Sequence, residues 1–293
     1  MQAEPSSIER ARERRGLLFG FVGVIAFSIT LPATRVAVAE LDPTFVGLGR
    51  AVVAALFAAI TLYVAQSPWP TRSQWQRLAV VAAGVVIGFP VLSAWAMQRV
   101  PASHGAVVIG LLPLATAAAG AWLAHERPSK RFWICSTLGS AIVVAFALRQ
   151  GGGHLQLADL LLIGAVAAAA IAYAEGARLS RTIGGWQVIS WALILALPFI
   201  VVPAALTMQH AAAASWSAWL GFGYVSLVSM YLGFFAWYKG LALGGIAKVG
   251  QVQLLQPFFT IAFSAIVIGE AVDAITFAAA ALVVASIALG RRA

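Results

Sequence analysis

The stretch AWYKGLALGGIAKVGQVQLLQPFFTIAFSAIVIGE, from Ala236 to Glu270, repeats the pattern of AWAMQRVPASHGAVVIGLLPLATAAAGAWLAHE, from Ala94 to Glu126. In both stretches an Ala-Trp pair ends one apolar run, and the next run contains a proline that precedes a glutamate. The interval from Pro113 to Glu126 equals the interval from Pro257 to Glu270, and the Ala-Trp pairs keep nearly the same offset. Because a nearly constant offset marks an internal duplication, the chain consists of two related halves.

Apolar runs dominate both halves. Of the 293 residues, 61% are hydrophobic and only 10% are charged, against about 25% charged in an ordinary soluble domain. A helix of about 20 apolar residues crosses a hydrocarbon layer of about 30 Å. Ten such runs are present, approximately over residues 17–39, 44–66, 76–97, 103–124, 132–148, 157–178, 186–207, 216–237, 247–268 and 273–289. We therefore predict an all-α membrane protein with ten transmembrane helices.

Each half contains five of the predicted helices. Because five is odd, the second half must cross the membrane in the opposite sense to the first, which makes the halves inverted repeats. We expect a cytoplasmic N-terminal segment over residues 1–15, a first repeat over 16–150 and a second over 151–293. Inverted repeats are a recurrent architecture of secondary transporters, whose substrate site lies between the halves.

The formal net charge of +9 follows the predicted topology. With the N-terminus in the cytoplasm, 15 of the 19 Lys and Arg residues fall on the cytoplasmic side, as the positive-inside rule favours. Both termini are then cytoplasmic, because ten spans return the chain to the side on which it began. This placement argues against a nucleic-acid partner. The single cysteine, Cys135, lies in an apolar run and is interpreted as a small hydrophobic residue.

The fourth predicted helix of each repeat begins with small residues, has Leu-Leu-Pro or Leu-Leu-Gln-Pro at its centre and ends in glutamate. Duplicated within ten spans, this pattern resembles the drug/metabolite transporter superfamily and its EamA-like branch, over nearly the full chain. Within the superfamily, the chain is similar to the bacterial aromatic amino acid exporters of the YddG type. The resemblance implies a carrier in the bacterial inner membrane that exports small metabolites, with aromatic amino acids favoured, by alternating access. It also implies a central cavity lined mainly by the first, third, fourth, sixth, eighth and ninth helices.

Polar side chains on the ninth run are the first binding candidates, because a polar group inside a membrane needs a partner or a cavity. At 100° per residue, Lys248 and Gln251 share one face of this predicted helix. The matching face of the fourth run carries His104. We expect these three residues to face the cavity, with Lys248 and Gln251 hydrogen-bonded to substrate. The alternatives are an interhelical hydrogen bond for the glutamine and an interfacial position for the lysine.

An aromatic face on the eighth run is the second candidate surface. Tyr224, Tyr231, Phe235 and Tyr238 recur at spacings of seven, four and three positions. Such a wall suits a flat apolar side chain, because offset stacking adds about 1 kcal/mol per pair beyond burial. Packing against a neighbouring helix is the alternative.

Other candidates come from the repeat and from helix kinks. Trp95 and Trp237 form a repeat-related pair that lines either the cavity or the membrane interface. Prolines remove backbone donors, so we predict kinks at Pro32, Pro90, Pro113 and Pro257. Thr30 and Ser93 stand close to two of these kinks. Their hydroxyls either bind cargo or donate to a carbonyl of their own helix.

Acidic residues are scarce in the predicted spans. Glu175 lies near the end of the sixth run, one helical turn from Arg178, and a local ion pair is the favoured interpretation. Because no mid-membrane pair of carboxylates is evident, we predict facilitated diffusion of substrate. His104 and Glu175 are the candidates for proton coupling.

The sequence is also compatible with other functions. A drug or other metabolite exporter of the same superfamily, with proton coupling, is the closest alternative, and a sensory or structural membrane protein is another. The four histidines are scattered over different loops and spans, so we expect no enzyme, no metal site and no cofactor. Two related halves can enclose a pathway within one chain, which predicts a functional monomer.

Overall fold

The computed structural model describes residues 7–124, 130–150, 152–208, 211–245, 249–250 and 252–291. Over these residues the chain is helical and contains no β-strand, as the composition predicts. The first half contains α1 Ser7–Ser28, α2 Thr30–Ala37, α3 Pro43–Val64, α4 Arg72–Val81, η1 Ala82–Gly88, α5 Phe89–Met97, α6 Ala102–Ile109, α7 Leu112–Ala124 and α8 Lys130–Gln150. The second half contains α9 Leu157–Ile183, α10 Gly185–Leu206, η2 Ala211–Ala213, α11 Trp216–Gly223, η3 Tyr224–Leu232, α12 Gly233–Gly244, η4 Gln253–Leu255, α14 Gln256–Ile268 and α15 Ala274–Arg291.

Eight helical stretches in the described part of the chain are long and apolar enough to cross a membrane, and they coincide with the first eight predicted runs. The last two runs form shorter apolar helices, Gln253–Ile268 and Ala274–Ser286. Many large apolar side chains lie on the outside of the bundle, among them Ile60, Phe199 and Ile266. A lipid environment accounts for this exposure, because hydrocarbon tails solvate apolar side chains as well as a protein core does.

Helix starts follow local capping chemistry. The Asp42 carboxylate accepts from the backbone N–H of Thr44 at 2.7 Å and of Phe45 at 3.2 Å, and Pro43 occupies the first turn of α3. At α4, Thr71 and Gln74 form a reciprocal capping box. These caps satisfy backbone donors that have no partner inside the helix.

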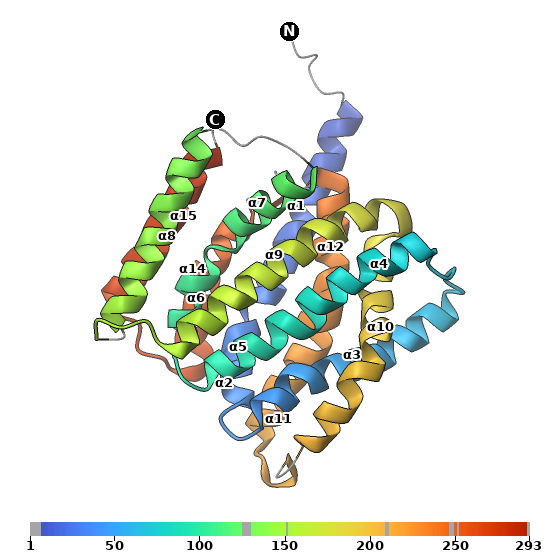
Figure 1. The fold of residues 1–293 in the computed structure, drawn as a ribbon, viewed down its shortest axis with the longest axis horizontal. Helices are drawn as coiled ribbons and strands as arrows, with labels where there is room; N and C mark the ends of the chain where they lie inside the picture. Colours follow the sequence, from blue (N-terminus) through green and yellow to red (C-terminus); the bar gives the residue numbers. More distant parts are fainter. Residues whose placement is uncertain are drawn as a thin grey trace.

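The two halves interlock in pairs of helices (Figure 1). The equivalent helices α3 and α10 have the same length, lie at one constant offset along the chain and pack against each other. In the same way α1 packs along α12, and α9 packs against α5 and α7. Helices α8 and α15 form a separate pair at one side of the bundle (Figure 1).

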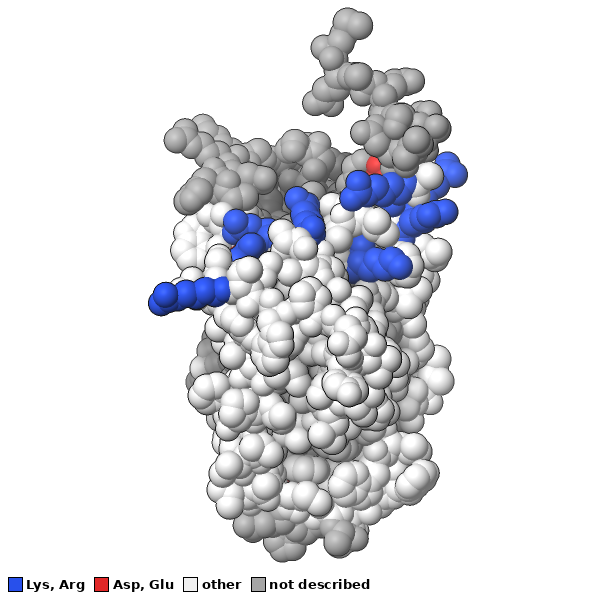
Figure 2. All heavy atoms as spheres, turned by 90° about the vertical axis from the view of Figure 1, so that its right-hand side faces the viewer, with Lys and Arg blue, Asp and Glu red and all other residues white. Residues whose placement is uncertain are grey.

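The described ends of the chain, at the start of α1 and the end of α15, lie at the same end of the bundle (Figure 1). Figure 2 shows Lys and Arg side chains gathered toward that end on one face of the molecule. The remainder of the described surface on this face carries no charged residue, which is the distribution expected of a protein that spans a bilayer.

Interruptions of the α-helix recur at matching places in the two halves. Two π-helical segments interrupt the spans, η1 in the first half and η3 in the second. Their last residues, Gly88 and Leu232, are separated along the chain by the same number of residues as Pro113 and Pro257. A second interruption precedes α7 in the first half and α14 in the second. The first residues of these two helices are separated by the same number of residues. Since π-helical turns often occur at functional sites, the space between the duplicated interruptions is the candidate functional site.

The prolines predicted to mark kinks follow these interruptions. Pro32, Pro90, Pro113 and Pro257 each lie in the first turn of a helix, at the starts of α2, α5, α7 and α14. A proline is tolerated there because the first turn has no intrahelical partner for its missing N–H.

Candidate functional site

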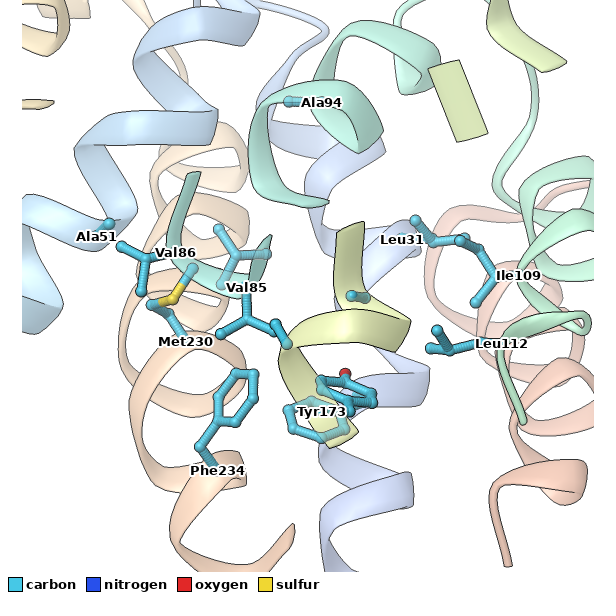
Figure 3. Packing of buried hydrophobic residues seen from close by; sticks show 14 of the residues in the cluster. Leu31, Ala51, Val85, Val86, Ala94, Ile109, Leu112, Tyr173, Met230 and Phe234 are labelled. Carbon is cyan, nitrogen blue, oxygen red and sulfur yellow. The ribbon is translucent and has the colours of Figure 1, made fainter. Parts of the chain in front are cut away.

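A small cavity lies where the interrupted helices of both halves meet. It offers about 20 Å³ to the centre of a water-sized sphere, which is room for water and not for a metabolite. Its lining is Phe27, Thr30, Leu31, Arg50, Val85, Phe89, Ile109, Leu112, Tyr173, Ser229, Met230, Phe234 and Gln256. Figure 3 shows Leu31, Ile109 and Leu112 on one side of Tyr173, and Val85, Met230 and Phe234 on the other. The structure therefore represents a nearly closed form of the cavity.

Repeat-related positions supply much of this lining. Three pairs of lining residues stand at equivalent places in the two halves, and they are Thr30 with Tyr173, Val85 with Ser229, and Leu112 with Gln256. In two of the pairs the first half contributes an apolar residue and the second half a polar one. The duplicated fold thus encloses a chemically asymmetric cavity.

Aromatic rings form one wall of the cavity. The ring of Phe27 stacks on Tyr173, with centroids 6.4 Å apart, and lies 5.0 Å from the ring of Phe234. Trp237, directly behind them, is 5.7 Å from Tyr173 and fully buried. Phe89 adds another ring to the lining. This wall can stack against a flat apolar group.

Three polar features break the apolar surface. The hydroxyl groups of Thr30 and Ser229 are hydrogen-bonded at 2.8 Å and so join the two halves. Arg50 is only 1% exposed, and its Nε and Nη1 have no hydrogen-bond partner among the described residues. Gln256 is buried, and its Oε1 likewise lacks a partner there. Groups buried without partners are costly, so Arg50 and Gln256 retain unused capacity for a ligand.

Lys248 and Gln251, the leading candidates from the sequence, lie outside the described residues. Of the remaining candidates, Thr30 alone lines the cavity.

The aromatic stripe of the eighth run does not form a cavity wall in this structure. The hydroxyl group of Tyr224 donates to the carbonyl of Ala26 at 2.9 Å. The hydroxyl group of Tyr231 is 3.3 Å from that of Ser190, and its ring contacts Phe235. Tyr238 is fully buried against neighbouring helices.

A change of helix type explains this difference. The predicted stripe assumed an α-helical period throughout, whereas η3 is π-helical and shifts the register of the helix that follows. Ser229, Met230 and Phe234 face the cavity instead.

The other candidates contact protein groups. Trp95 is 39% exposed and its indole donates to Thr44 at 3.2 Å, whereas its repeat partner Trp237 packs behind the aromatic wall. Ser93 donates to the carbonyl of Pro90 at 3.2 Å, within its own helix. His104 is buried, with its Nε2 2.7 Å from Oδ1 of Asp159. None of these residues lines the cavity that the structure describes.

Glu175 forms an ion pair with Arg178, as their separation by one helical turn predicts, and a second ion pair with Arg77. Its Oε2 is 3.4 Å from Nη1 of Arg178, and its Oε1 also pairs with Nε of Arg77. Glu175 is thus buried between two cations and does not line the cavity.

Sequence reasoning missed four of the polar lining residues, Arg50, Tyr173, Ser229 and Gln256. A signal for Arg50 was present, because an arginine in the middle of an apolar run is rare and marks a functional candidate. Tyr173 could have been found from its repeat partner Thr30, whereas the repeat partners of Ser229 and Gln256 are the apolar Val85 and Leu112, which no sequence signal marks.

Apolar helices of membrane-spanning length, arranged as two related halves around a small cavity, define a multi-pass membrane protein. The model of the EamA-like transporter family matches residues 14–148 and again residues 156–290. The chain belongs to this family of transporters, within the drug/metabolite transporter superfamily, and is a multi-pass protein of the bacterial inner membrane.

A curated relative agrees with this assignment, and a solved structure shares the fold. The chain is 46% identical over 279 residues to "Uncharacterized transporter YdeK" of Bacillus subtilis (strain 168), in an alignment that covers 94% of this chain and 97% of that protein. It also resembles a protein of known crystal structure, with a TM-score of 0.65 and 16% identity, over 94% of this chain and 96% of that one. The structural likeness concerns the fold alone.

Proposed function

We propose that this transporter exports small metabolites, with aromatic amino acids as the favoured substrates, by alternating access through the cavity between its halves. The main support for this proposal is the lining of the cavity, in which four aromatic rings lie beside a buried arginine. Rings accommodate a flat apolar side chain, and a cation suits the carboxylate end of an amino acid.

The topology proposed with this function has ten spans, two inverted five-helix repeats and both termini in the cytoplasm. The two family matches, over residues 14–148 and 156–290, support the division into repeats at 16–150 and 151–293. The common position of the chain ends and of the basic side chains supports the cytoplasmic assignment. Since one chain encloses the cavity, the carrier functions as a monomer.

The proposed mechanism is facilitated diffusion. Among the described residues, no acidic side chain lines the cavity, so the lining offers no carboxylate to exchange a proton or bind sodium beside the substrate. The same feature disfavours a cationic drug, which an unpaired arginine would repel. The cavity is too small for a metabolite in this structure, so the helices must separate to admit cargo, first on one side and then on the other.

A proton-coupled exporter of another metabolite is the second candidate. The buried contact between His104 and Asp159 favours it, because a histidine beside a carboxylate can bind and release a proton. Substrate accumulation against its gradient, driven by a pH gradient alone, would identify this mechanism.

Uptake of labelled tryptophan into liposomes that contain the purified protein tests the function, with equal pH on both sides. The expected result is saturable uptake that phenylalanine blocks and that threonine and a cationic dye inhibit much less. Uptake no greater than in empty liposomes would overturn the assignment of aromatic amino acids.

A further inference from the structure

We propose that Arg50 is the substrate-binding residue that takes the carboxylate group of the transported molecule. The inference rests on the proposed function, which it deepens by naming the charged group of the substrate and the residue that recognises it.

Arg50 occupies a costly position. It lies about two turns into α3, roughly 10 Å along the helix from its first residue, and is 1% exposed. An ionised side chain at such a depth in a membrane protein requires a partner or a water-filled space. Nε and Nη1 find no acceptor in the described part of the chain, so these groups do not tie α3 to a neighbouring helix. A purely structural arginine would be expected to make such bonds.

No described carboxylate is available as the counterion of Arg50. The acidic side chains that contact other groups are Glu40 with Ser215, Asp42 with Thr44, Asp159 with His104, Glu175 with Arg77 and Arg178, Glu270 with Ala102 and Ser103, and Asp273 with Thr276. Glu13 lies about four turns before Phe27 along α1, which is roughly 20 Å from the cavity. Among the carboxylates that the structure describes, none offsets the charge of Arg50, and the carboxylate of a bound substrate would supply that negative charge.

The surrounding groups favour a carboxylate on a zwitterion. A planar guanidinium binds a carboxylate through two parallel hydrogen bonds. One cation matches one monoanion, whereas a phosphate dianion would leave excess negative charge in the cavity. The unpartnered Oε1 of Gln256 can accept a hydrogen bond from an ammonium group, and the hydroxyl oxygens of Thr30 and Ser229 offer further acceptors.

The duplicated fold supplies this arginine only once. Because α3 and α10 begin at Pro43 and Gly185 and have the same length, the position equivalent to Arg50 in the second half is Ala192, which is fully buried. A single carboxylate site therefore serves both orientations of the carrier, and the asymmetry fixes which way the substrate lies.

A change in the substrate tests the inference on the unmodified protein. In liposomes, unlabelled tryptophanamide, in which a neutral amide replaces the carboxylate, is compared with tryptophan as a competitor of labelled tryptophan uptake. The expected result is half-maximal inhibition at a concentration at least about tenfold higher for the amide, since charge-assisted hydrogen bonds are lost. Equal inhibition by the two compounds would overturn the inference.

Variants of Arg50 provide the second arm. Arg50→Gln is expected to raise the half-saturation concentration for tryptophan about tenfold or more and to abolish the preference over tryptophanamide, with Arg50→Lys intermediate. Arg99→Gln is the matched control, because Arg99 is exposed and contacts Trp95 at the surface. Size-exclusion profiles and circular dichroism verify folding. An Arg50→Gln protein that keeps the wild-type preference would contradict the assignment.

Binding in detergent separates failure of the inference from failure of the proposed function. If the wild-type protein takes up no tryptophan, the proposed function fails, and the carboxylate site is judged by thermal stabilisation with indole-3-acetate, indole-3-acetamide and inorganic phosphate. Stabilisation by indole-3-acetate that Arg50→Gln removes supports the site. Equal stabilisation by acid and amide, stabilisation by phosphate alone, or none at all overturns it.

Discussion

His104 and Asp159 form a buried contact between the fourth and sixth predicted spans, with Nε2 of the histidine 2.7 Å from Oδ1 of the aspartate. Both residues are almost inaccessible, and Phe146 packs on the imidazole ring at a centroid distance of 5.1 Å. The other carboxylate oxygen accepts from the backbone N–H of Gln156 at 2.9 Å. The contact thus joins the first repeat to the start of the second.

Removal of His104 should destabilise the protein strongly. His104→Leu leaves the Asp159 carboxylate buried with a backbone donor as its described partner, and we expect a loss of about 3–5 kcal/mol in the free energy of unfolding. Denaturant unfolding in detergent measures it. The double variant His104→Leu/Asp159→Asn should recover part of the loss, and His154→Ala, at an exposed turn, should have no effect. A His104→Leu protein as stable as His154→Ala would contradict this role.

Glu270 holds the start of α6 across the two halves. Its carboxylate oxygens accept from the backbone N–H groups of Ala102 at 2.8 Å and Ser103 at 3.0 Å. Glu270→Gln should cost about 0.5–2 kcal/mol and speed hydrogen exchange at these two amides, because the helix start loses a charged acceptor. The exposed Gln98→Ala serves as the control. Unchanged exchange at both amides would show that the contact does not stabilise α6.

Glu40 gives the protein a pH-dependent contact outside the spans. The hydroxyl group and the backbone N–H of Ser215 donate to its carboxylate at 2.5 and 2.6 Å and hold its pKa below the usual value. A lowered folded-state pKa means that the contact stabilises the protein above the unfolded-state pKa and is lost as the pH falls through the folded-state value. We expect Glu40→Gln to lower Tm slightly at neutral pH and the difference to vanish in acid. A difference that grows in acid would contradict this sign.

Close packing of η1 against α9 depends on Gly84. A Cβ atom at this position would lie 2.3 Å from the carbonyl oxygen of Ala168 and 2.5 Å from Cβ of Ala172. Gly84→Ala should therefore cost about 1–3 kcal/mol in unfolding free energy. Gly120→Ala is the control, since nothing lies within 4 Å and alanine favours a helix by up to about 1 kcal/mol. Equal stabilities of the two variants would show that η1 does not depend on this approach.

The duplicated motif predicted that the two halves share helix boundaries, because prolines set where a helix begins through their effect on the adjacent backbone. Pro113 and Pro257 lie directly after interruptions at matching positions, as their place in the repeat indicates. The partner of His104 was not predictable, since Asp159 is far away in sequence and no local pattern links them. The residues of the eighth run that line the cavity, Ser229, Met230 and Phe234, could not be predicted from an α-helical period, because the segment before Gly233 is π-helical. Arg50 was visible as an anomaly, but only the packing of both halves shows that it lines the cavity.

A reversible cross-link between the halves would show whether the cavity must open and close during transport. The hydroxyl oxygens of Thr30 and Ser229 are 2.8 Å apart, so the two side chains point toward each other and are the pair to replace with cysteines. Thr30→Cys and Ser229→Cys would be combined with Cys135→Ala, which removes the single native cysteine, and tryptophan uptake would be measured after oxidation and again after reduction. We predict that oxidation stops uptake, that reduction restores it, and that uptake by either single cysteine variant does not change on oxidation. Fully cross-linked protein that transports as fast as the reduced protein would contradict the account.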